Sequence, residues 1–197
     1  MLAGSSPADH YATKADYRIG KITRSETVAP RDGSDGCSAP PRIIGNPFED
    51  GGDTTGATNT VGQIPMSCNG NYDIVPGPDH IYLFSVPDSN SLVFTATTPD
   101  DDYDLSIYVI SACGDGTTCL TGAAADDCFA RNAGTNPCGA VSRESFGPVA
   151  FAAGDYFFHV DSFYVSPNAL GRDSGPYDLR VEGGPLVPVE LLSFTVD

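Results

Sequence analysis

Five short apolar segments between turn residues constrain the fold of this chain more than any other feature. Each has five or six residues, is rich in β-branched and aromatic side chains, and often alternates apolar with polar positions. They are residues 81–86, 92–97, 105–110, 156–160 and 177–181. This pattern is typical of strands with a buried face. Because no window carries a convincing helical stripe, the sequence predicts an all-β protein, an antiparallel sandwich or jelly roll.

The length of 197 residues suits one domain of about 150 residues with extensions. We expect an extended N-terminal arm at 1–36, a sandwich at 37–184, and an apolar C-terminal strand or linker at 185–197. The polar arm has the composition of a disordered segment. Exposed on its own, the apolar end would be a sticky, unpaired strand. It is either the last strand of its own domain, or it or the arm pairs with a sheet edge of another subunit.

Negative charge is concentrated in the expected sandwich. The formal net charge is −16, and 21 of the 26 acidic residues follow Cys37, against five arginines. The first 36 residues are neutral and hold both lysines. A body with this charge disfavours DNA and anionic membrane surfaces as partners and needs counter-ions or a basic partner. No run approaches the 18 apolar residues of a membrane span, so we expect no membrane insertion.

Basic residues in the arm offer such a partner. Lys14, Arg18, Lys21 and Arg24 follow one another at intervals of three or four residues. We expect them to meet the carboxylates of a neighbouring copy of the chain. A head-to-tail contact of this kind builds filaments when its rotation does not close into a ring.

Six cysteines all lie in the expected sandwich, at Cys37, Cys68, Cys113, Cys119, Cys128 and Cys138. An even number, in loops rich in glycine and aspartate, predicts disulfides and an extracellular or cell-surface location. A four-thiolate zinc site is the alternative, but the spacings of the last four cysteines do not match its short paired hooks. Many pairings are open. Short loops favour Cys37–Cys68, Cys113–Cys119 and Cys128–Cys138. Because residues 1–4 begin no apolar signal core, we expect a mature or trimmed form.

The densest group of carboxylates is a candidate calcium site. Asp100, Asp101, Asp102 and Asp104 surround Tyr103, and alternate acids in this run resemble the first ligands of a calcium loop. The EF-hand pattern then fails, because Leu105 replaces the turn glycine and Ser111 the bidentate glutamate.

Ligands from a second loop would complete a Ca²⁺ site of another kind. Asp126 and Asp127 are the expected second donors, and Asp161 with Asp173 is a further candidate pair. A solvated acidic turn is the alternative. Residues 49–53, which hold three acids, are a weaker candidate that we expect to be a plain loop.

Catalytic motifs are weak in this sequence. Residues 171–176, Gly-Arg-Asp-Ser-Gly-Pro, are similar to the nucleophile loop of trypsin-like proteases. A serine nucleophile needs a histidine base and an orienting acid, and none of His10, His80 and His159 lies in a matching motif. Paired acids could suggest a glycosidase. The sequence has no tryptophan on which a sugar ring could stack in a binding cleft, and this argues against that activity. We therefore expect no enzyme, with a small hydrolase as the remaining alternative.

The order of these pieces resembles the bacterial pre-peptidase C-terminal domain. The matching parts are Cys37, Cys68, residues 78–86, residues 102–109, the Cys113 loop ending in Asp126 and Asp127, residues 153–161 and residues 175–181. The resemblance implies a β-sandwich without its own catalysis, carried by exported proteins and often binding calcium through loop carboxylates. The loop from 113 to 148 is longer here and holds four cysteines, so we expect its disulfides and ligands to differ from those of the family. The residues given before the match do not form a peptidase, so we expect a role other than the usual accessory one.

Taken together, these features predict a secreted bacterial structural protein that binds calcium and assembles with copies of itself through its arm or its terminal strand. The alternative is a monomeric accessory module of a secreted enzyme. Such a module would bind carbohydrate or protein, and surface polysaccharide is a candidate partner. Sedimentation with and without a chelator separates the two hypotheses.

Overall fold

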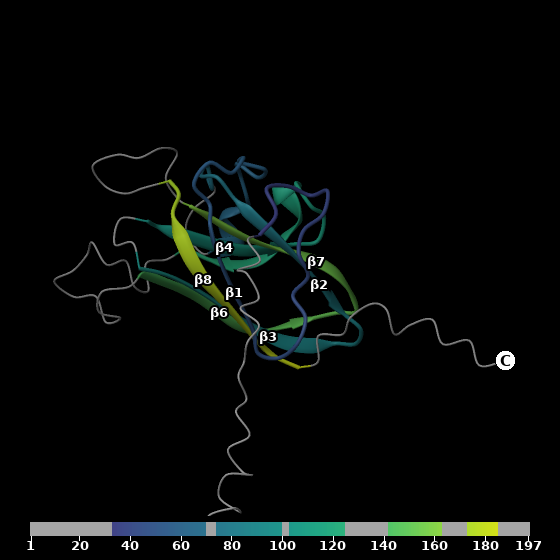
Figure 1. The fold of residues 1–197 in the computed structure, drawn as a ribbon. Helices are drawn as coiled ribbons and strands as arrows, with labels where there is room; N and C mark the ends of the chain where they lie inside the picture. Colours follow the sequence, from purple (N-terminus) through teal and green to yellow (C-terminus); the bar gives the residue numbers. More distant parts are fainter. Residues whose placement is uncertain (1–32, 70–73, 100–102, 125–141, 163–172, 185–197) are drawn as a thin grey trace, which may run out of the picture.

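Two four-stranded antiparallel sheets face each other in the computed structural model of the chain (Figure 1). The structure describes residues 33–69, 74–99, 103–124, 142–162 and 173–184. The first sheet has the strand order β1-β8-β3-β6, and the second has the order β2-β7-β4-β5. The elements are β1 (Phe48–Asp53), α2 (Met66–Asn69), β2 (His80–Val86), β3 (Asn90–Thr98), β4 (Leu105–Ile110), the 3₁₀ turn η2 (Gly116–Thr118), β5 (Cys119–Ala123), β6 (Ser142–Phe151), β7 (Gly154–Ser162) and β8 (Pro176–Gly183).

The core lies between the sheets and is built by alternation along the strands. In β8 the inward residues Tyr177, Leu179 and Val181 are buried, while the intervening charged side chains are exposed. Phe94 of β3 stacks on Phe158 of β7 across the interior, with ring centroids 5.0 Å apart. Side chains on one face of a strand share a layer, so the period-two pattern of the sequence becomes this aromatic core.

All five expected strands are present, and the expected antiparallel sandwich is confirmed. Strands β1, β5 and β6 were not predicted. The expectation of a plain loop at 49–53 is wrong, because Phe48 pairs with Val181 and Asp53 with Pro176 along β1 and β8. These residues read as a loop because acids and glycines dominate them. The neighbouring strand β8 supplies the partner that the local sequence does not reveal.

A third layer covers the outer face of the second sheet. Residues 54–69 and 74–79, here called the cover layer, lie between β1 and β2 in the chain and include α2. Their apolar side chains pack on Tyr108 and Ile110 of β4; those that are buried are Val61, Ile64, Cys68 and Val75. All six residues of β4 are therefore buried. Leu105, Ile107 and Val109 pack in the core, and Tyr108 and Ile110 pack beneath the cover layer.

Two disulfides hold the loops to the sandwich. Cys37 is bonded to Cys113, and Cys68 is bonded to Cys119. The expected pairs Cys37–Cys68 and Cys113–Cys119 are therefore wrong. Short loops close most readily in an unfolded chain, but the fold brings Cys68 of α2 onto β5 and Cys37 onto the loop after β4. Cys128 and Cys138, with their expected pairing, lie outside the described residues.

The described chain contacts the sandwich from its first residues. Ser34 forms a backbone bridge with Ile81 of β2, and Asp35 accepts hydrogen bonds from the backbone and side chain of Thr58. The last residues of the expected arm therefore lie against the cover layer and β2. The rest of the arm, with Lys14, Arg18, Lys21 and Arg24, and the apolar end at 185–197 lie outside the described residues. In the described part, no helix is long and apolar enough to cross a membrane.

Candidate functional site

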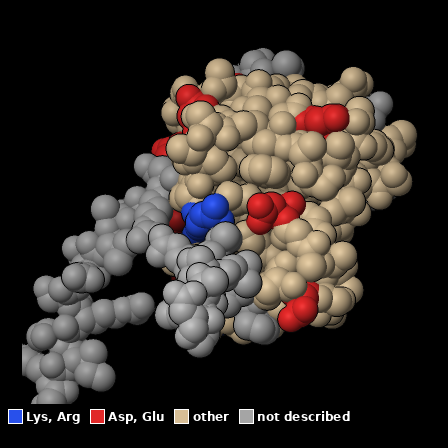
Figure 2. Space-filling view, turned by 90° about the vertical axis from the view of Figure 1, so that its right-hand side faces the viewer, with Lys and Arg blue, Asp and Glu red and all other residues tan. Residues whose placement is uncertain are grey.

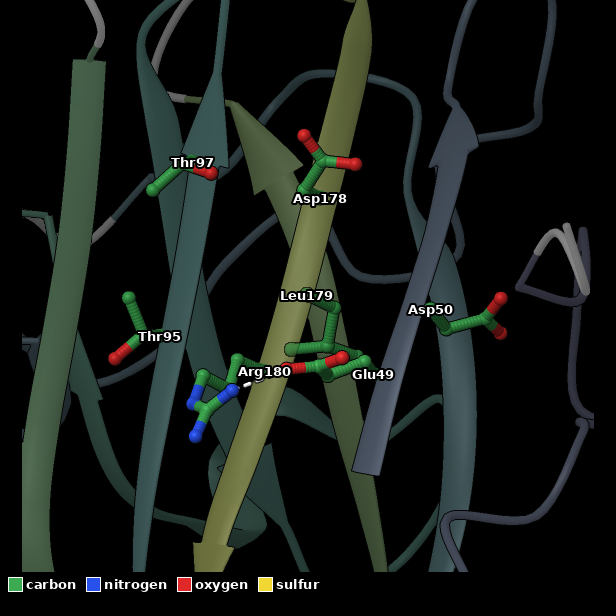
Figure 3. Close-up of a pocket in the computed structure, with 7 residues that line it drawn as sticks. All are labelled: Glu49, Asp50, Thr95, Thr97, Asp178, Leu179 and Arg180. Carbon is green, nitrogen blue, oxygen red and sulfur yellow. Dashed lines mark hydrogen bonds and ion pairs between the residues drawn. The ribbon is translucent and has the colours of Figure 1, made fainter. Parts of the chain in front are cut away.

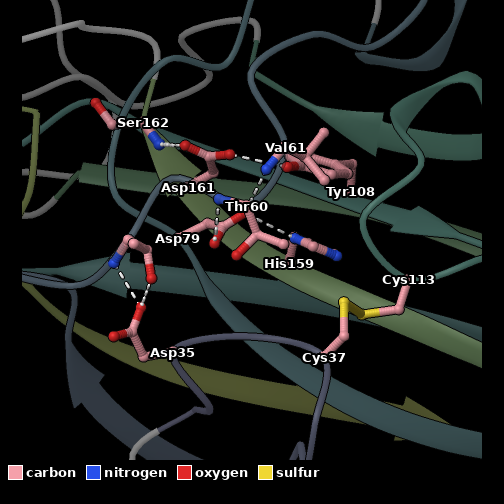
Figure 4. A network of polar contacts seen from close by, with 11 residues as sticks. Asp35, Cys37, Thr60, Val61, Asp79, Tyr108, Cys113, His159, Asp161 and Ser162 are labelled. Carbon is pink, nitrogen blue, oxygen red and sulfur yellow. Dashed lines mark hydrogen bonds and ion pairs between the residues drawn. A yellow bond between two sulfur atoms is a disulfide. The ribbon is translucent and has the colours of Figure 1, made fainter.

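A cluster of ionisable side chains lies between the second sheet and the cover layer (Figure 4). Tyr108 comes from β4, His159 and Asp161 come from alternate positions of β7, and Asp79 directly precedes β2. All four side chains are fully buried. The rings of Tyr108 and His159 stack, with centroids 4.9 Å apart. Alternation along β7 sends Phe158 and Val160 into the core and turns His159 and Asp161 to the opposite face.

Asp79 fastens the cover layer to β7. Its carboxylate accepts hydrogen bonds from the backbone N–H groups of Thr60 and Val61, each at 3.2 Å. Its Oδ2 also lies 3.2 Å from Nδ1 of His159. A carboxylate accepts, so this contact fits the histidine tautomer with its hydrogen on Nδ1. Nε2 of His159 has no hydrogen-bond partner among the described residues.

Asp161 accepts hydrogen bonds at both of its oxygens. The Tyr108 hydroxyl donates to Oδ2 at 2.8 Å, and the Ser162 N–H donates to Oδ1 at 2.7 Å. Burial raises the pKa of Asp161 well above its usual range, and the nearby Asp79 raises it further. Burial also raises the pKa of Tyr108.

This cluster is a structural element and not an open reaction centre. A catalytic histidine or acid must reach the substrate within hydrogen-bond distance, and here the cover layer closes the cluster to solvent. Asp79 instead supplies acceptors for the backbone of the cover layer, and Asp161 supplies acceptors for Tyr108 and Ser162. Buried polar networks of this kind fix one arrangement of the layers they join.

The candidate calcium ligands are only partly described. Asp104 is buried at the start of β4, and Asp161 is turned inward to Tyr108. Asp173 and Ser162 both pack closely against Gly77. A methyl group on Gly77 would come within 2.7 Å of the Ser162 side chain and of the Asp173 carbonyl oxygen. Within the described ranges no group of three or more histidine, cysteine, aspartate or glutamate residues is arranged to hold a metal ion. Asp100, Asp101, Asp102, Asp126 and Asp127 lie outside those ranges, so the calcium site stays a prediction.

The serine of the protease-like loop does not meet a histidine. The Ser174 hydroxyl donates to the Asp173 carboxylate at 3.1 Å. His159 is held by Asp79 beneath the cover layer, and His80 lies 3.0 Å from the Tyr177 hydroxyl. Neither described histidine is therefore placed as a base for Ser174.

An open pocket lies on the outer face of the first sheet (Figure 3). It is lined by Glu49, Asp50, Thr95, Thr97, Asp178, Leu179 and Arg180. Arg180 sits at its centre and forms ion pairs with Glu49 of β1 and Glu182 of β8. The hydrogen bond to Glu182 raises the pKa of Arg180 and lowers the pKa of Glu182. Arg180 is thus paired with two carboxylates, and the residues around it combine charged groups, hydroxyls and the apolar Leu179.

Acidic groups also outnumber basic ones over the surface. The described residues include fourteen acids and three arginines. In the view of Figure 2 the acidic groups are scattered over the described surface, and basic groups are scarce. The charge imbalance could be predicted from the sequence, but the pocket could not. The residues that line the pocket come from three strands, which only the fold brings together.

Comparisons with known proteins return little. No protein-family description matches the chain, and no curated protein sequence matches it. Among solved structures, the pre-peptidase C-terminal domain of a collagenase from Bacillus anthracis is similar. The match has 14% sequence identity and a TM-score of 0.38, and it covers 72% of this chain and 93% of that domain. This is the domain type that the sequence resembles.

Proposed function

We propose that this chain is a secreted structural protein without catalytic activity, whose β-sandwiches assemble with one another through the N-terminal arm. The observation that carries the proposal is the division of charge between the sandwich and the arm. The described part of the sandwich has thirteen acids against three arginines, whereas the first 36 residues have five basic and five acidic side chains.

Charge repulsion supports an intermolecular role for the arm. Sandwiches of one sign repel one another and bind poorly to other acidic surfaces. The arm carries half of the chain's basic residues, which can pair with the acids of a neighbouring sandwich. Because the arm as a whole is neutral, that sandwich does not repel it strongly. Each copy contains both an acidic surface and an arm, so the contact is heterologous and repeats from copy to copy.

The disulfides support secretion. They join segments 76 and 51 residues apart, and such bonds persist in oxidising compartments outside the cytosol. A closed buried cluster, together with Ser174 lacking a histidine base among the described residues, supports a role other than hydrolysis.

Calcium is the second part of the proposal. Acids crowded at 100–102 and 104 repel one another unless a cation neutralises them, and Ca²⁺ accepts six to eight oxygen ligands. Binding there would lower the charge of each sandwich and so ease its approach to a neighbour. The ion therefore acts as a cofactor of assembly.

Sedimentation velocity of the full chain tests this function. We expect large species in calcium at low salt, a shift toward monomer on adding a chelator, and weaker assembly at high salt because screening shortens the reach of surface charges. The variant that replaces Lys14, Arg18, Lys21 and Arg24 with glutamine should remain a monomer. Replacing Arg42 and Arg143 of the sandwich with glutamine is the matched control and should still assemble. A monomer in calcium at every concentration would refute the proposal.

A monomeric binding module is the second candidate, and the open pocket on the first sheet favours it. Arg180, Glu49 and Asp178, with the two threonine hydroxyls, offer donors and acceptors for a polar ligand such as a surface polysaccharide. Titration of the full chain with soluble polysaccharides would test it. Binding that is lost in Arg180→Gln, by a chain that stays monomeric, would favour this candidate.

A further inference from the structure

The edge strand β1 differs from the other three edges of the sandwich. Beside β2, Ser34 and Arg42 form backbone bridges with Ile81 and Leu83. Strand β5 lies against α2 and β6, and β6 contains Pro148, which cannot donate a backbone hydrogen bond. Strand β1 pairs with β8 on one side, and no described residue pairs with its other side. A strand at the edge of a sheet is a template for a further strand.

The outward side chains of β1 carry negative charge at a regular interval. Glu49 and Asp53 are exposed and lie four residues apart on the same face, with Gly51 between them. In Figure 3 the Glu49 side chain reaches from β1 toward Arg180 of β8. This ion pair shows that an arginine on a strand beside β1 meets Glu49 in antiparallel register, since Glu49 pairs with Arg180.

The arm contains a segment with the complementary pattern. Residues 14–19 read Lys-Ala-Asp-Tyr-Arg-Ile. In an extended strand Lys14, Asp16 and Arg18 share one face, while Ile19 faces the other way. Antiparallel to β1, this segment places Lys14 opposite Asp53, Asp16 opposite Gly51, and Arg18 opposite Glu49. The same register places Ile19 beside Phe48, at the end of the core.

The described chain begins next to this edge. Gly33 and Gly52 both lie against the Tyr177 hydroxyl, so closely that a methyl group on either would come within 3.1 Å of it. Residues 20–32 can span about 43 Å when extended, and β1 is about 20 Å long. The segment can therefore reach β1 of its own chain or of another copy.

We propose that residues 14–19 add to the outer edge of β1 as an antiparallel strand, with Arg18 on Glu49 and Lys14 on Asp53. This inference rests on the proposed function for the role of the arm and names its docking site. Backbone hydrogen bonds supply the binding, and the alternating charges set the register. Assembly follows when the strand comes from another copy.

Zero-length cross-linking of the full chain tests the docking directly. A carbodiimide joins a lysine amine to a carboxylate in contact with it, and both lysines of this chain, Lys14 and Lys21, lie in the arm. We expect Lys14–Asp53 to be the main product in mass spectra of the digested protein. A main product between Lys14 and Glu49 would overturn the antiparallel register. Lysine cross-links spread over the acids without preference for β1 would overturn the docking.

Matched variants separate strand pairing from general charge attraction. Asp16→Pro removes a backbone donor in the middle of the added strand and should lower the Lys14–Asp53 product by about fivefold or more. Glu26→Pro, in the same arm outside the segment, should leave it unchanged. Glu49→Gln should lower it by about two- to fivefold, whereas Glu182→Gln, which also loses a contact to Arg180 but lies on β8, should not. Equal effects of the two proline variants, or of the two glutamine variants, would refute the inference.

Isotope mixing tells this inference apart from the proposed function. Unlabelled and ¹⁵N-labelled chains are mixed before cross-linking, and the Lys14–Asp53 product is analysed for its mass. Products that combine both isotopes support docking between copies. Products of a single isotope support docking within one chain and refute assembly by the arm. Assembly in sedimentation without any Lys14–Asp53 product would keep the function and refute this docking site.

Discussion

Nδ1 of His159 lies 3.2 Å from Oδ2 of Asp79, and neither side chain is exposed to solvent. The contact joins the middle of β7 to the end of the cover layer. Since Asp79 also binds the backbone of Thr60 and Val61, one carboxylate holds two distant parts of the chain together. The ionisable side chains of Asp79 and His159 are therefore part of the scaffold of the fold.

Replacing Asp79 should destabilise the fold strongly. Asp79→Ala leaves two backbone N–H groups and Nδ1 of His159 without their acceptor in a buried place, which should lower the free energy of unfolding by about 3–5 kcal/mol. Asp79→Asn keeps one acceptor oxygen and should cost less. Urea denaturation followed by circular dichroism measures both. Equal stability of Asp79→Ala and the unmodified protein would contradict the role given to this carboxylate.

The raised pKa of Asp161 predicts a pH dependence with a definite sign. An acid whose pKa is higher in the folded than in the unfolded chain contributes stability below the unfolded value of about 4, and loses that contribution as pH rises toward the folded value. Asp161→Asn removes the titration. The unfolding free energy of the unmodified protein, relative to this variant, should therefore fall above pH of about 4, by at most about 1.4 kcal/mol per pH unit.

An exposed acid on the same strand is the control for that experiment. Asp155 begins β7 at the surface and accepts a hydrogen bond from Ser85. The same comparison with Asp155→Asn measures how the loss of one exposed negative charge changes the unfolding free energy at each pH. A parallel dependence in both variants would show that general charge repulsion, and not the burial of Asp161, governs the pH response.

Loss of the Cys68–Cys119 disulfide should loosen the cover layer. The bond closes a loop with a sequence separation of 51, and the chain-entropy model assigns such a loop about 4 kcal/mol. In the double variant Cys68→Ala/Cys119→Ala, amide hydrogen exchange should increase at residues 61–69 before it increases in β3 and β8. A uniform increase across all strands would contradict a separate cover layer.

Phe94 should be a main support of the core. Its ring stacks on Phe158 at 5.0 Å and on Phe146 at 5.0 Å, and it is fully buried. Phe94→Ala should lower the free energy of unfolding by about 3–5 kcal/mol because it leaves a cavity between the sheets. Leu120→Ala, at an exposed position of β5, is the control and should change it by about 0.5 kcal/mol or less. Thermal and urea unfolding measure both variants.

Local pattern was sufficient for the strands that bury a face. Residues 105–110 are apolar at nearly every position, which is the sequence sign of burial on both faces, and β4 is buried on both. Strands β1 and β6 lack that pattern, since an edge strand needs only one neighbour and tolerates acids, glycine and proline. The pocket could not be predicted for the same reason, because Glu49, which lines it, belongs to a segment with the sequence pattern of a loop.

The sequence by itself determined the all-β class, five strands, the acidic body and the presence of disulfides, because alternation, charge and cysteine number are local or additive properties. Only the tertiary structure decided which of the described cysteines pair, that β1 lies at the edge of its sheet, and that His159 and Asp161 are buried beneath the cover layer. These depend on contacts between segments distant in the chain, and such contacts follow from how layers pack rather than from any short pattern of residues.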